Sequence, residues 1–207
     1  MHNHKIKAVI FDLGNVLVDF NHQIAAKRIA SFSDKSPQEI FDLFFDSQLT
    51  ELFEEGKISP EDFFLKVKEM LNARLSYEEF LPVWNEIFFL SDKNRGVYEL
   101  AGSLARDYRI AVLSNINILH FQYLKSKFPI FGIFSQVITS YEVGFRKPKH
   151  PIYKKSIESL MVAPENIFYT DDRPELVDSA KALGIRGFVF KGISQLKEDL
   201  KNAGVKL

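Results

Sequence analysis

The sequence contains no cysteine. This absence excludes disulfide frameworks, thiolate nucleophiles and cysteine-ligated zinc sites together. The sequence also lacks an apolar run of the roughly 18 residues that a membrane span would need. Residues 1–7 are polar and lead directly into a short apolar segment, without the pattern of a signal peptide. We therefore expect a cytoplasmic protein that has no membrane partner.

An excess of charge of either sign is absent as well. Lys and Arg together number 27, and so do Asp and Glu, so the chain carries no net basic field. A basic surface is the usual footprint of nucleic-acid binding, and we expect no nucleic-acid partner. The 207 residues, of which 46% are hydrophobic, suit one globular domain or a domain with a modest insertion. Oligomeric state does not follow from any of these features.

Short apolar segments alternate with helical patterns over most of the chain. The expected strands cover residues 8–11, 109–113, 136–139, 167–169 and 187–190. The expected helices between them cover residues 95–107, 118–127, 151–160, 174–183 and 193–202. This alternation predicts an α/β fold, with a Rossmann-like parallel sheet flanked by helices. Ligands bind outside the carboxyl ends of such strands, so polar residues that follow different strands should converge on one cleft.

From about residue 21 to residue 91 the strand pattern stops and helical periodicity replaces it. Ser36-Pro37 and Ser59-Pro60 each have the form of an N-cap followed by Pro at the first helical position. Aromatic residues at helical spacing predict the inner face of a helical bundle, and they include Phe41, Phe44, Phe45, Phe63, Phe64 and, farther on, Trp84. We expect a Rossmann-like core of residues 1–20 and 92–207, and an inserted helical-bundle cap of residues 21–91.

The first candidate motif is Phe11-Asp12-Leu13-Gly14-Asn15, directly after the first expected strand. A carboxylate at a strand end can attack phosphorus and form an aspartyl phosphate, which divides hydrolysis into two easier displacements. The alternative for Asp12 alone is a turn residue or a helix cap.

Two further motifs follow later strands. Ser114-Asn115 offers a hydroxyl group and the amides of a turn, which could hold the oxygens of a phosphoryl group. The alternative is capping of the next helix. In Gly144-Phe145-Arg146-Lys147-Pro148, the compact charge of Lys147 suits the stabilisation of a carboxylate and a phosphoryl group together. The alternative for this loop is a solvated turn.

The fourth motif is the acidic pair Asp171-Asp172, which follows the expected strand 167–169. Adjacent carboxylates form an all-oxygen environment of the kind that Mg²⁺ prefers, with water and substrate phosphate as its other ligands. The alternative is an N-cap for the helix that begins near Pro174.

Taken together and in this order, the four motifs resemble the haloacid dehalogenase superfamily of phosphohydrolases, over nearly the whole chain. The Asp12-Leu13-Gly14-Asn15 signature and residues 54–59 are similar to a bacterial branch that contains sugar-phosphate phosphatases. The resemblance implies a Mg²⁺-dependent phosphatase. Its substrate would be a small phosphorylated metabolite, with a sugar phosphate as the first candidate. Hydrolysis would pass through an aspartyl phosphate.

The resemblance also implies a role for each matching position. Asp12 would be the nucleophile and a Mg²⁺ ligand, and the backbone carbonyl of Gly14 would be a second ligand. Ser114 and Asn115 would bind the phosphate, and Lys147 would stabilise charge on both carboxylate and phosphate. Asp172 would bind the metal directly, with Asp171 beside it in direct or water-mediated contact.

One position departs from the pattern of the family. Many members carry a second Asp two residues after the nucleophile, as general acid and base, and here that position is Gly14. Proton transfer is worth about 10²- to 10⁴-fold in rate, so the difference matters. Either Asp19 or His22 reaches the site instead, or the substrate has a good leaving group. The remaining histidines are expected in surface or terminal positions, namely His120, His150, His2 and His4.

Three rival functions stay open. A 2-haloacid dehalogenase also uses an Asp nucleophile but attacks carbon without a metal, so it gains nothing from Asp171-Asp172. A phosphomutase depends more heavily on the acid and base that Gly14 lacks. A noncatalytic phosphometabolite-binding or regulatory domain would bind phosphate or metal without turnover.

Overall fold

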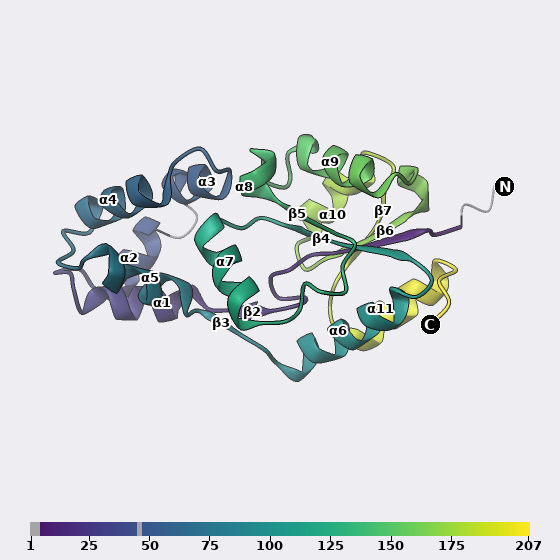
Figure 1. The fold of residues 1–207 in the computed structure, drawn as a ribbon, viewed down its shortest axis with the longest axis horizontal. Helices are drawn as coiled ribbons and strands as arrows, with labels where there is room; N and C mark the ends of the chain where they lie inside the picture. Colours follow the sequence, from purple (N-terminus) through teal and green to yellow (C-terminus); the bar gives the residue numbers. More distant parts are fainter. Residues whose placement is uncertain (1–4, 45–46) are drawn as a thin grey trace.

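A five-stranded parallel sheet forms the centre of the larger lobe of the protein (Figure 1). The structure is a computed structural model that describes residues 5–44 and 47–207, so His2, His4 and Phe45 lie outside it. The strand order is β5-β4-β1-β6-β7. The strands are β1 (Ala8–Phe11), β4 (Arg109–Ser114), β5 (Gln136–Thr139), β6 (Ile167–Asp171) and β7 (Arg186–Val189). The predicted α/β fold is confirmed, and β1, which precedes Asp12, lies in the middle of the sheet.

Helices cover both faces of this sheet, because both faces of each central strand are apolar. Val9 and Phe11 of β1 point into a core with the helices drawn below the sheet in Figure 1, α6 (Asp92–Leu104) and α11 (Ile193–Asn202). Ala8 and Ile10 point into the other core, with the helices drawn above it, α9 (His150–Leu160) and α10 (Pro174–Lys181). Three further elements belong to the lobe: α7 (Ile118–Lys127), α8 (Ser140–Val143) and the 3₁₀ helix η1 (Pro164–Asn166).

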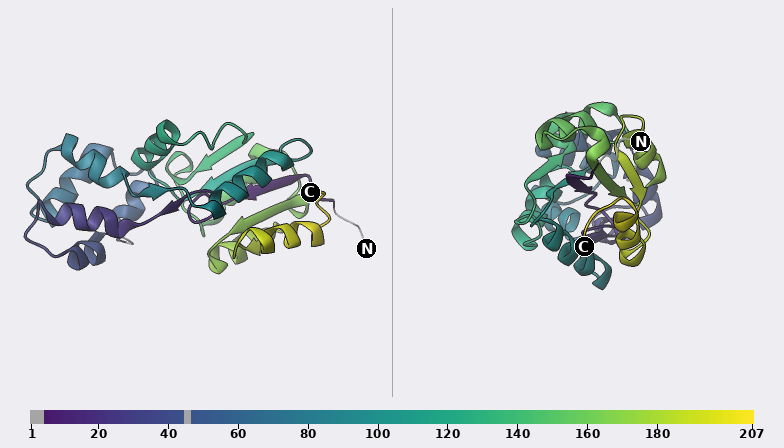
Figure 2. Two further views of the ribbon diagram at one scale, coloured as in Figure 1. Left: turned by 90° about the horizontal axis from the view of Figure 1, so that it is seen from below. Right: turned by 90° about the vertical axis from the view of Figure 1, so that its right-hand side faces the viewer.

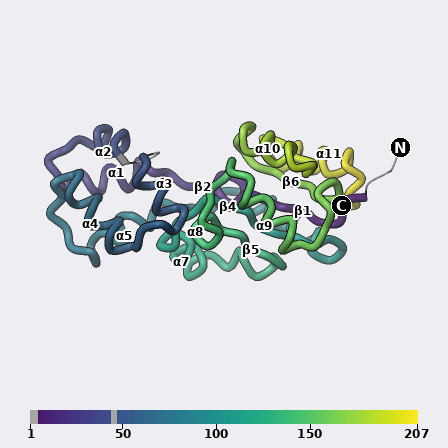
Figure 3. Tube along the Cα trace, turned by 90° about the horizontal axis from the view of Figure 1, so that it is seen from above, coloured from purple at the N-terminus to yellow at the C-terminus, as the bar shows by residue number. Residues whose placement is uncertain are grey.

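A second lobe of helices lies at one end of the elongated molecule, beyond the carboxyl edge of the sheet (Figures 2 and 3). Its helices are α1 (His22–Ala30), α2 (Pro37–Phe44), α3 (Gln48–Glu54), α4 (Pro60–Met70) and α5 (Tyr77–Asn85). They enclose a separate hydrophobic cluster in which Phe63 stacks on Phe53 and contacts Trp84. Trp84 is fully buried, which confirms its expected packing role. The separate cluster supports our proposal of a cap over residues 21–91.

The two connections between the lobes pair with each other. Strand β2 (Asp19–Phe20) runs antiparallel to β3 (Phe88–Phe89), with Asp19 opposite Phe89. The expectation of a purely helical insertion is therefore wrong for Phe88 and Phe89. Two residues are too few to display the alternation that marks a strand, and the pairing joins segments far apart in sequence.

The ends of several elements differ from the sequence expectation by a few residues. Helix α6 begins at Asp92, three residues earlier than expected, because Ser91 and Asn94 form a reciprocal capping box before the apolar pattern begins. Strand β6 extends to Asp171, so the first residue of the acidic pair belongs to the sheet. Within the described part of the chain, no helix combines the length and apolar character needed to cross a bilayer.

Candidate active site

Residues from three adjacent strands meet at the carboxyl edge of the sheet. Asp12 follows β1, Ser114 ends β4 and Asp171 ends β6. Asp12 and Ser114 line a cavity of about 280 Å³ between the two lobes, and Asp171 is hydrogen-bonded to Lys147, which also lines it. The cavity is lined by Asp12, Gly14, Asn15, Phe20, His22, Glu54, Ser114, Asn115, Arg146, Lys147, Asp172, Arg173 and Leu176. The structure thus brings the residues of all four motifs together, as expected from the strand ends.

Lys147 is the buried cation of this site, with only 3% of its surface exposed. Its Nζ donates hydrogen bonds to Asp12 Oδ1 at 2.7 Å, to Asp171 Oδ2 at 2.7 Å and to the carbonyl oxygen of Leu113 at 3.0 Å. Burial alone would lower the pKa of Lys147, but the charges of Asp12 and Asp171 outweigh it and raise the pKa above its usual range. The burial and the ion pairs exclude a solvated turn at this position.

The carboxylates around Lys147 are not balanced by it. Burial, and then the charge of Asp171, raises the pKa of Asp12 to about 7. Burial, with a contribution from Asp171, also raises the pKa of Asp172. Asp171 differs, because the charge and hydrogen bond of Lys147 overcome the effect of burial and lower its pKa. Three carboxylates therefore share one lysine, which leaves excess negative charge in the site.

The same three carboxylates fit a divalent cation. Ligand atoms of Asp12, Asp171 and Asp172 all lie within 4.8 Å of one another, which makes an all-oxygen donor set. A divalent cation would supply the charge that Lys147 alone does not offset, and this would favour ionised Asp12 and Asp172. Asp172 is held in place by a hydrogen bond of 3.0 Å from Asn15 Nδ2. These residues suit Mg²⁺ by charge and by donor type.

Neither Ser114 nor Asn115 caps the helix that follows. The N-cap of α7 is Asn117, whose side chain accepts a hydrogen bond from the backbone N–H of His120. Ser114 is buried at the end of β4. The side chain of Asn115 exchanges two hydrogen bonds with the backbone of Lys147, at 2.9 and 2.7 Å. The Asn115 side chain therefore positions the lysine, a role that the sequence did not indicate because the two residues lie on different loops.

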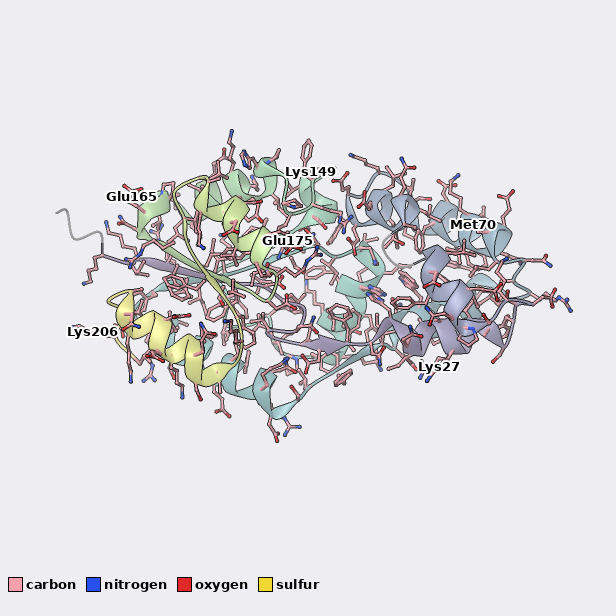
Figure 4. The ribbon with its side chains drawn as sticks, turned by 180° about the vertical axis from the view of Figure 1, so that it is seen from behind. Lys27, Met70, Lys149, Glu165, Glu175 and Lys206 are labelled. Atoms are coloured by element: carbon pink, nitrogen blue, oxygen red, sulfur yellow. The ribbon has the colours of Figure 1, made fainter. Side chains whose placement is uncertain are left out.

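A cluster of ion pairs joins the cap to the segment 144–149 that carries Lys147, here called the lysine loop. Arg146 contacts Glu51 and Glu54 of α3, each at 2.8 Å. Glu55 is almost fully buried and accepts from Lys149 Nζ at 2.5 Å and from the backbone N–H of Arg146 at 3.1 Å. Lys149 accordingly lies where the two lobes meet in Figure 4. The sequence contained a signal for this contact, since residues 54–59 carried part of the family resemblance, but it gave no partner for them.

The backbone approaches very closely at the same junction. Gly56 has a φ of +64°, and a Cβ there would lie 2.3 Å from the carbonyl oxygen of Tyr141. Glycine alone fits such a contact, because any side chain would collide with backbone atoms. In addition, Ser140 Oγ donates a hydrogen bond of 2.6 Å to the carbonyl oxygen of Glu54. The end of α3 and the residues that follow it thus pack closely against α8 of the core, beside the ion pairs.

The two candidate substitutes for the missing acid and base lie in different surroundings. Asp19 accepts from Lys93 Nζ at 2.7 Å and from Asn94 Nδ2 at 3.2 Å, and it is not among the residues that line the cavity. His22 does line it. The expected surface position of His120 is wrong: it is buried, with its ring nitrogens bonded to Asn117 and to the carbonyl oxygen of Trp84. His150 is exposed, as expected.

Comparisons with known proteins give a consistent result. Residues 6–184 match the family model of haloacid dehalogenase-like hydrolases. The chain is similar to a D-ribitol-5-phosphate phosphatase of Bacteroides thetaiotaomicron, with 25% identity over 201 residues that cover 94% of this chain and 97% of that protein.

Two solved structures are also similar. One is an enzyme of the same family from B. thetaiotaomicron, in complex with magnesium and inorganic phosphate, with a TM-score of 0.79 and 26% identity over 90% of this chain and 94% of that one. The other is a hydrolase of this type from Porphyromonas gingivalis, with a TM-score of 0.81 over 95% of this chain and 98% of that one. At 23% identity, the second likeness supports the fold alone.

Proposed function

The chain belongs to the haloacid dehalogenase-like hydrolases and is a phosphatase of that family, and we propose that Asp12 is its nucleophile toward a small phosphorylated polyol or sugar. The observation that carries the proposal is the position of Asp12. It lies in the cavity at the end of the central strand, held at 2.7 Å by Lys147 and beside Asp171 and Asp172. A carboxylate so placed is oriented for attack on a phosphoryl group that the lysine helps to neutralise.

In the first step, an oxygen of Asp12 attacks phosphorus and the bond from phosphorus to the ester oxygen breaks. The Ser114 hydroxyl group and the backbone N–H of Asn115 donate hydrogen bonds to the phosphoryl oxygens. Lys147 favours the ionised form of Asp12 and stabilises the charge of the aspartyl phosphate. In the second step, water attacks the same phosphorus atom and Asp12 is released as a carboxylate.

Asp12, Asp172 and the backbone carbonyl of Gly14 would hold Mg²⁺, with Asp171 in direct or water-mediated contact. When bound, the metal supplies positive charge to the phosphoryl oxygens and lowers their repulsion of Asp12. Asn15 contributes by orienting Asp172 through its hydrogen bond. The excess negative charge of the three carboxylates supports this assignment, as does their mutual distance within 4.8 Å.

The wall of the cavity on the cap side supports a small, hydroxyl-rich substrate. His22 and Glu54 from the cap and Arg146 from the core line it together with Phe20. Such polar groups can exchange hydrogen bonds with hydroxyl groups, while one aromatic face covers a carbon chain. The similar phosphatase of B. thetaiotaomicron acts, by its name, on D-ribitol 5-phosphate. We therefore propose that the substrate is a polyol or sugar phosphate of about five or six carbon atoms, a size that suits a cavity of about 280 Å³.

The rival functions make different demands on this site. A dehalogenase would gain nothing from Asp171 and Asp172 beside its attacking carboxylate, because repulsion among the three would only lower the ionised fraction of the nucleophile. A noncatalytic domain would bind phosphate or Mg²⁺ without turnover. The cytoplasmic location and the absence of a nucleic-acid partner stay predictions from composition.

The test is an assay of the wild-type protein and of Asp12→Asn with p-nitrophenyl phosphate and a panel of polyol and sugar phosphates. We expect turnover that needs Mg²⁺ and ends with chelator. Asp12→Asn should lower it by at least roughly 10³-fold, since removal of a nucleophile forfeits most of the rate enhancement. Phosphate and Mg²⁺ binding without turnover by the folded wild-type protein would support the noncatalytic domain instead.

A further inference from the structure

The space in which the missing acid and base would stand is filled in this protein. A Cβ atom added to Gly14 would lie 2.8 Å from Cε1 of Phe20, closer than carbon atoms approach each other. An aspartate at this position would need the Phe20 ring to move. Phe20 in turn packs against Phe88 across the β2–β3 ribbon, with ring centroids 6.2 Å apart. The proton-transfer group, if the protein has one, therefore lies elsewhere in the cavity.

A histidine next to Phe20 is a candidate for the missing proton-transfer group. It contacts the imidazole of His22, with ring centroids 4.9 Å apart and the planes inclined by 60°. His22 is the first residue of α1 and lines the main cavity together with Asp12, Ser114 and Lys147. It also lines a smaller adjoining cavity of about 60 Å³, which Gly14 and Ser114 share. The imidazole thus borders the space where the leaving group of a substrate on Asp12 would lie.

Three other titratable groups near this space are less suited to proton transfer. Asp19 is bound by Lys93 and Asn94. Burial lowers the pKa of His120 to about 3, so that side chain is neutral and stays so at ordinary pH. Glu54 is paired with Arg146 at 2.8 Å. An imidazole, by contrast, donates and accepts protons near neutral pH and is the commonest proton-transfer group in enzymes.

We propose that His22 is the proton-transfer residue of this phosphatase, in place of the aspartate that Gly14 excludes. The inference rests on the proposed function. As Asp12 attacks phosphorus, the ester oxygen leaves with the bonding electron pair and takes a proton from the imidazolium of His22, which gives the alcohol and neutral His22. In the second step neutral His22 takes a proton from the attacking water. The bond from phosphorus to Asp12 breaks, and its electron pair returns to the carboxylate as inorganic phosphate departs.

His22 belongs to the cap, so its proton transfer depends on how the cap lies relative to the core. His22 reaches the cavity from the first turn of α1, whereas Asp12 and Lys147 belong to the core. The acid and base would therefore be complete only when the cap lies against the core, as it does here through Arg146 and Glu54. The charged groups that line the same cavity are Glu54 from α3, Arg146 and Lys147 from the lysine loop, and Asp12, Asp172 and Arg173 from the strand ends. Neutral His120 from α7 lines the smaller cavity with His22.

The test compares leaving groups in the Mg²⁺-loaded full-length protein. His22→Asn should lower kcat/KM by about 10²-fold or more for the polyol or sugar phosphate that the wild-type enzyme hydrolyses fastest, because an alkoxide is a poor leaving group without a proton. For p-nitrophenyl phosphate the first step should be nearly unchanged, since nitrophenolate leaves unprotonated. The second step should slow, so that a burst of nitrophenolate appears. Asp19→Asn is the matched control and should leave the ratio of the two substrates as in the wild type.

A second measurement covers the case in which His22→Asn does not fold. In the wild type, kcat/KM for the sugar or polyol phosphate should fall with one proton as the pH rises and the imidazolium is lost, and this limb should be absent for p-nitrophenyl phosphate. The inference would be overturned if His22→Asn lowered kcat/KM equally for both substrates. It would also be overturned if kcat/KM of the wild type fell at high pH in the same way for both. If the wild type hydrolyses neither substrate, the proposed function fails as well, so the two failures are distinguishable.

Discussion

Lys147 Nζ lies 2.7 Å from Asp12 Oδ1, although the two residues are 135 positions apart in the sequence. The contact is made in the interior, where Lys147 is 3% exposed and Asp12 is 7% exposed. Charges at such a place interact strongly, and each one depends on its partner for its charged form. The behaviour of either residue after substitution should therefore report on the whole site.

Lys147→Met should destabilise the protein by about 3 kcal/mol in the absence of Mg²⁺, because Asp12 and Asp171 lose their buried countercharge. Activity should fall by about 10²-fold or more, as expected for the loss of a preorganised charge. Chemical unfolding with and without Mg²⁺ measures the first effect, and Mg²⁺ should offset part of it. Lys154→Met, at an exposed position of α9, is the control. Equal stability of the two variants would contradict the structural role of the contact.

Mg²⁺ should raise the thermal midpoint of the wild-type protein, since a ligand that binds only the folded state adds stability. At a concentration of 100 times its Kd the gain is about 2.7 kcal/mol. Asp172→Asn should lose most of this shift. Asp178→Asn changes a carboxylate on the surface of α10 that pairs with Lys181, and it should keep the shift. A full shift in Asp172→Asn, followed by calorimetric Mg²⁺ titration with unchanged affinity, would remove Asp172 from the metal ligands.

Glu55 should make the junction of cap and core sensitive to acid. Burial by itself would raise its pKa, but hydrogen bonds from Lys149, Lys57 and the backbone of Arg146 outweigh it and lower the pKa to about 2. The folded state therefore favours the ionised form, so its contribution is present above pH 4.5 and is lost as the pH falls from there toward 2.

Glu55→Gln should accordingly lower the free energy of unfolding by about 1–2 kcal/mol at neutral pH. Charge-assisted hydrogen bonds contribute this much after a reduction for the exposure of the two lysines to solvent. The difference from the wild type should shrink as the pH falls below 4.5. Urea unfolding at several pH values measures it, with Glu158→Gln on the exposed side of α9 as control. A difference that is constant from pH 7 to pH 3 would mean that the charge of Glu55 does not stabilise the junction.

Gly14 and Phe20 should be energetically coupled, because a Cβ at position 14 meets the Phe20 ring at 2.8 Å. Gly14→Ala should cost about 1–3 kcal/mol through overpacking. Phe20→Leu in the same chain should reduce that cost by at least about 0.5 kcal/mol in a double-mutant cycle. Gly102→Ala in α6, where nothing lies within 4 Å, should instead be neutral or stabilising. Additive effects at positions 14 and 20 would show that the ring yields freely.

Much of this arrangement could be predicted from the sequence, since local patterns determine it. Apolar segments that end in Asp12, Ser114 and Asp171 predicted the parallel sheet and the edge at which these residues meet. Side-chain partners were less accessible. The hydrogen bonds between Asn115 and Lys147, and the ion pairs between Arg146 and α3, join segments far apart in sequence, and no local pattern identifies the two partners.

His120 illustrates the same limit. A lone histidine near a loop is usually solvated, and a surface position was expected on that ground. Its burial depends on Trp84 of the cap, whose ring stacks on it at 4.7 Å and whose carbonyl accepts from it. The environment of a core helix is thus partly created by the inserted lobe, which no single window of sequence contains.

The β2–β3 ribbon restricts how the two lobes move relative to each other. Because the chain enters and leaves the cap through paired strands, sliding one connection past the other would break the hydrogen bonds between Asp19–Phe20 and Phe88–Phe89. Rotation about the ribbon would keep them, but it would break the ion pairs of Arg146 and Lys149 with α3 and Glu55 and the contacts between Trp84 and His120. Among the contacts described between the lobes, salt screens the ion pairs and leaves the backbone pairing of the ribbon unchanged, so added salt should weaken the hold of the core on α3.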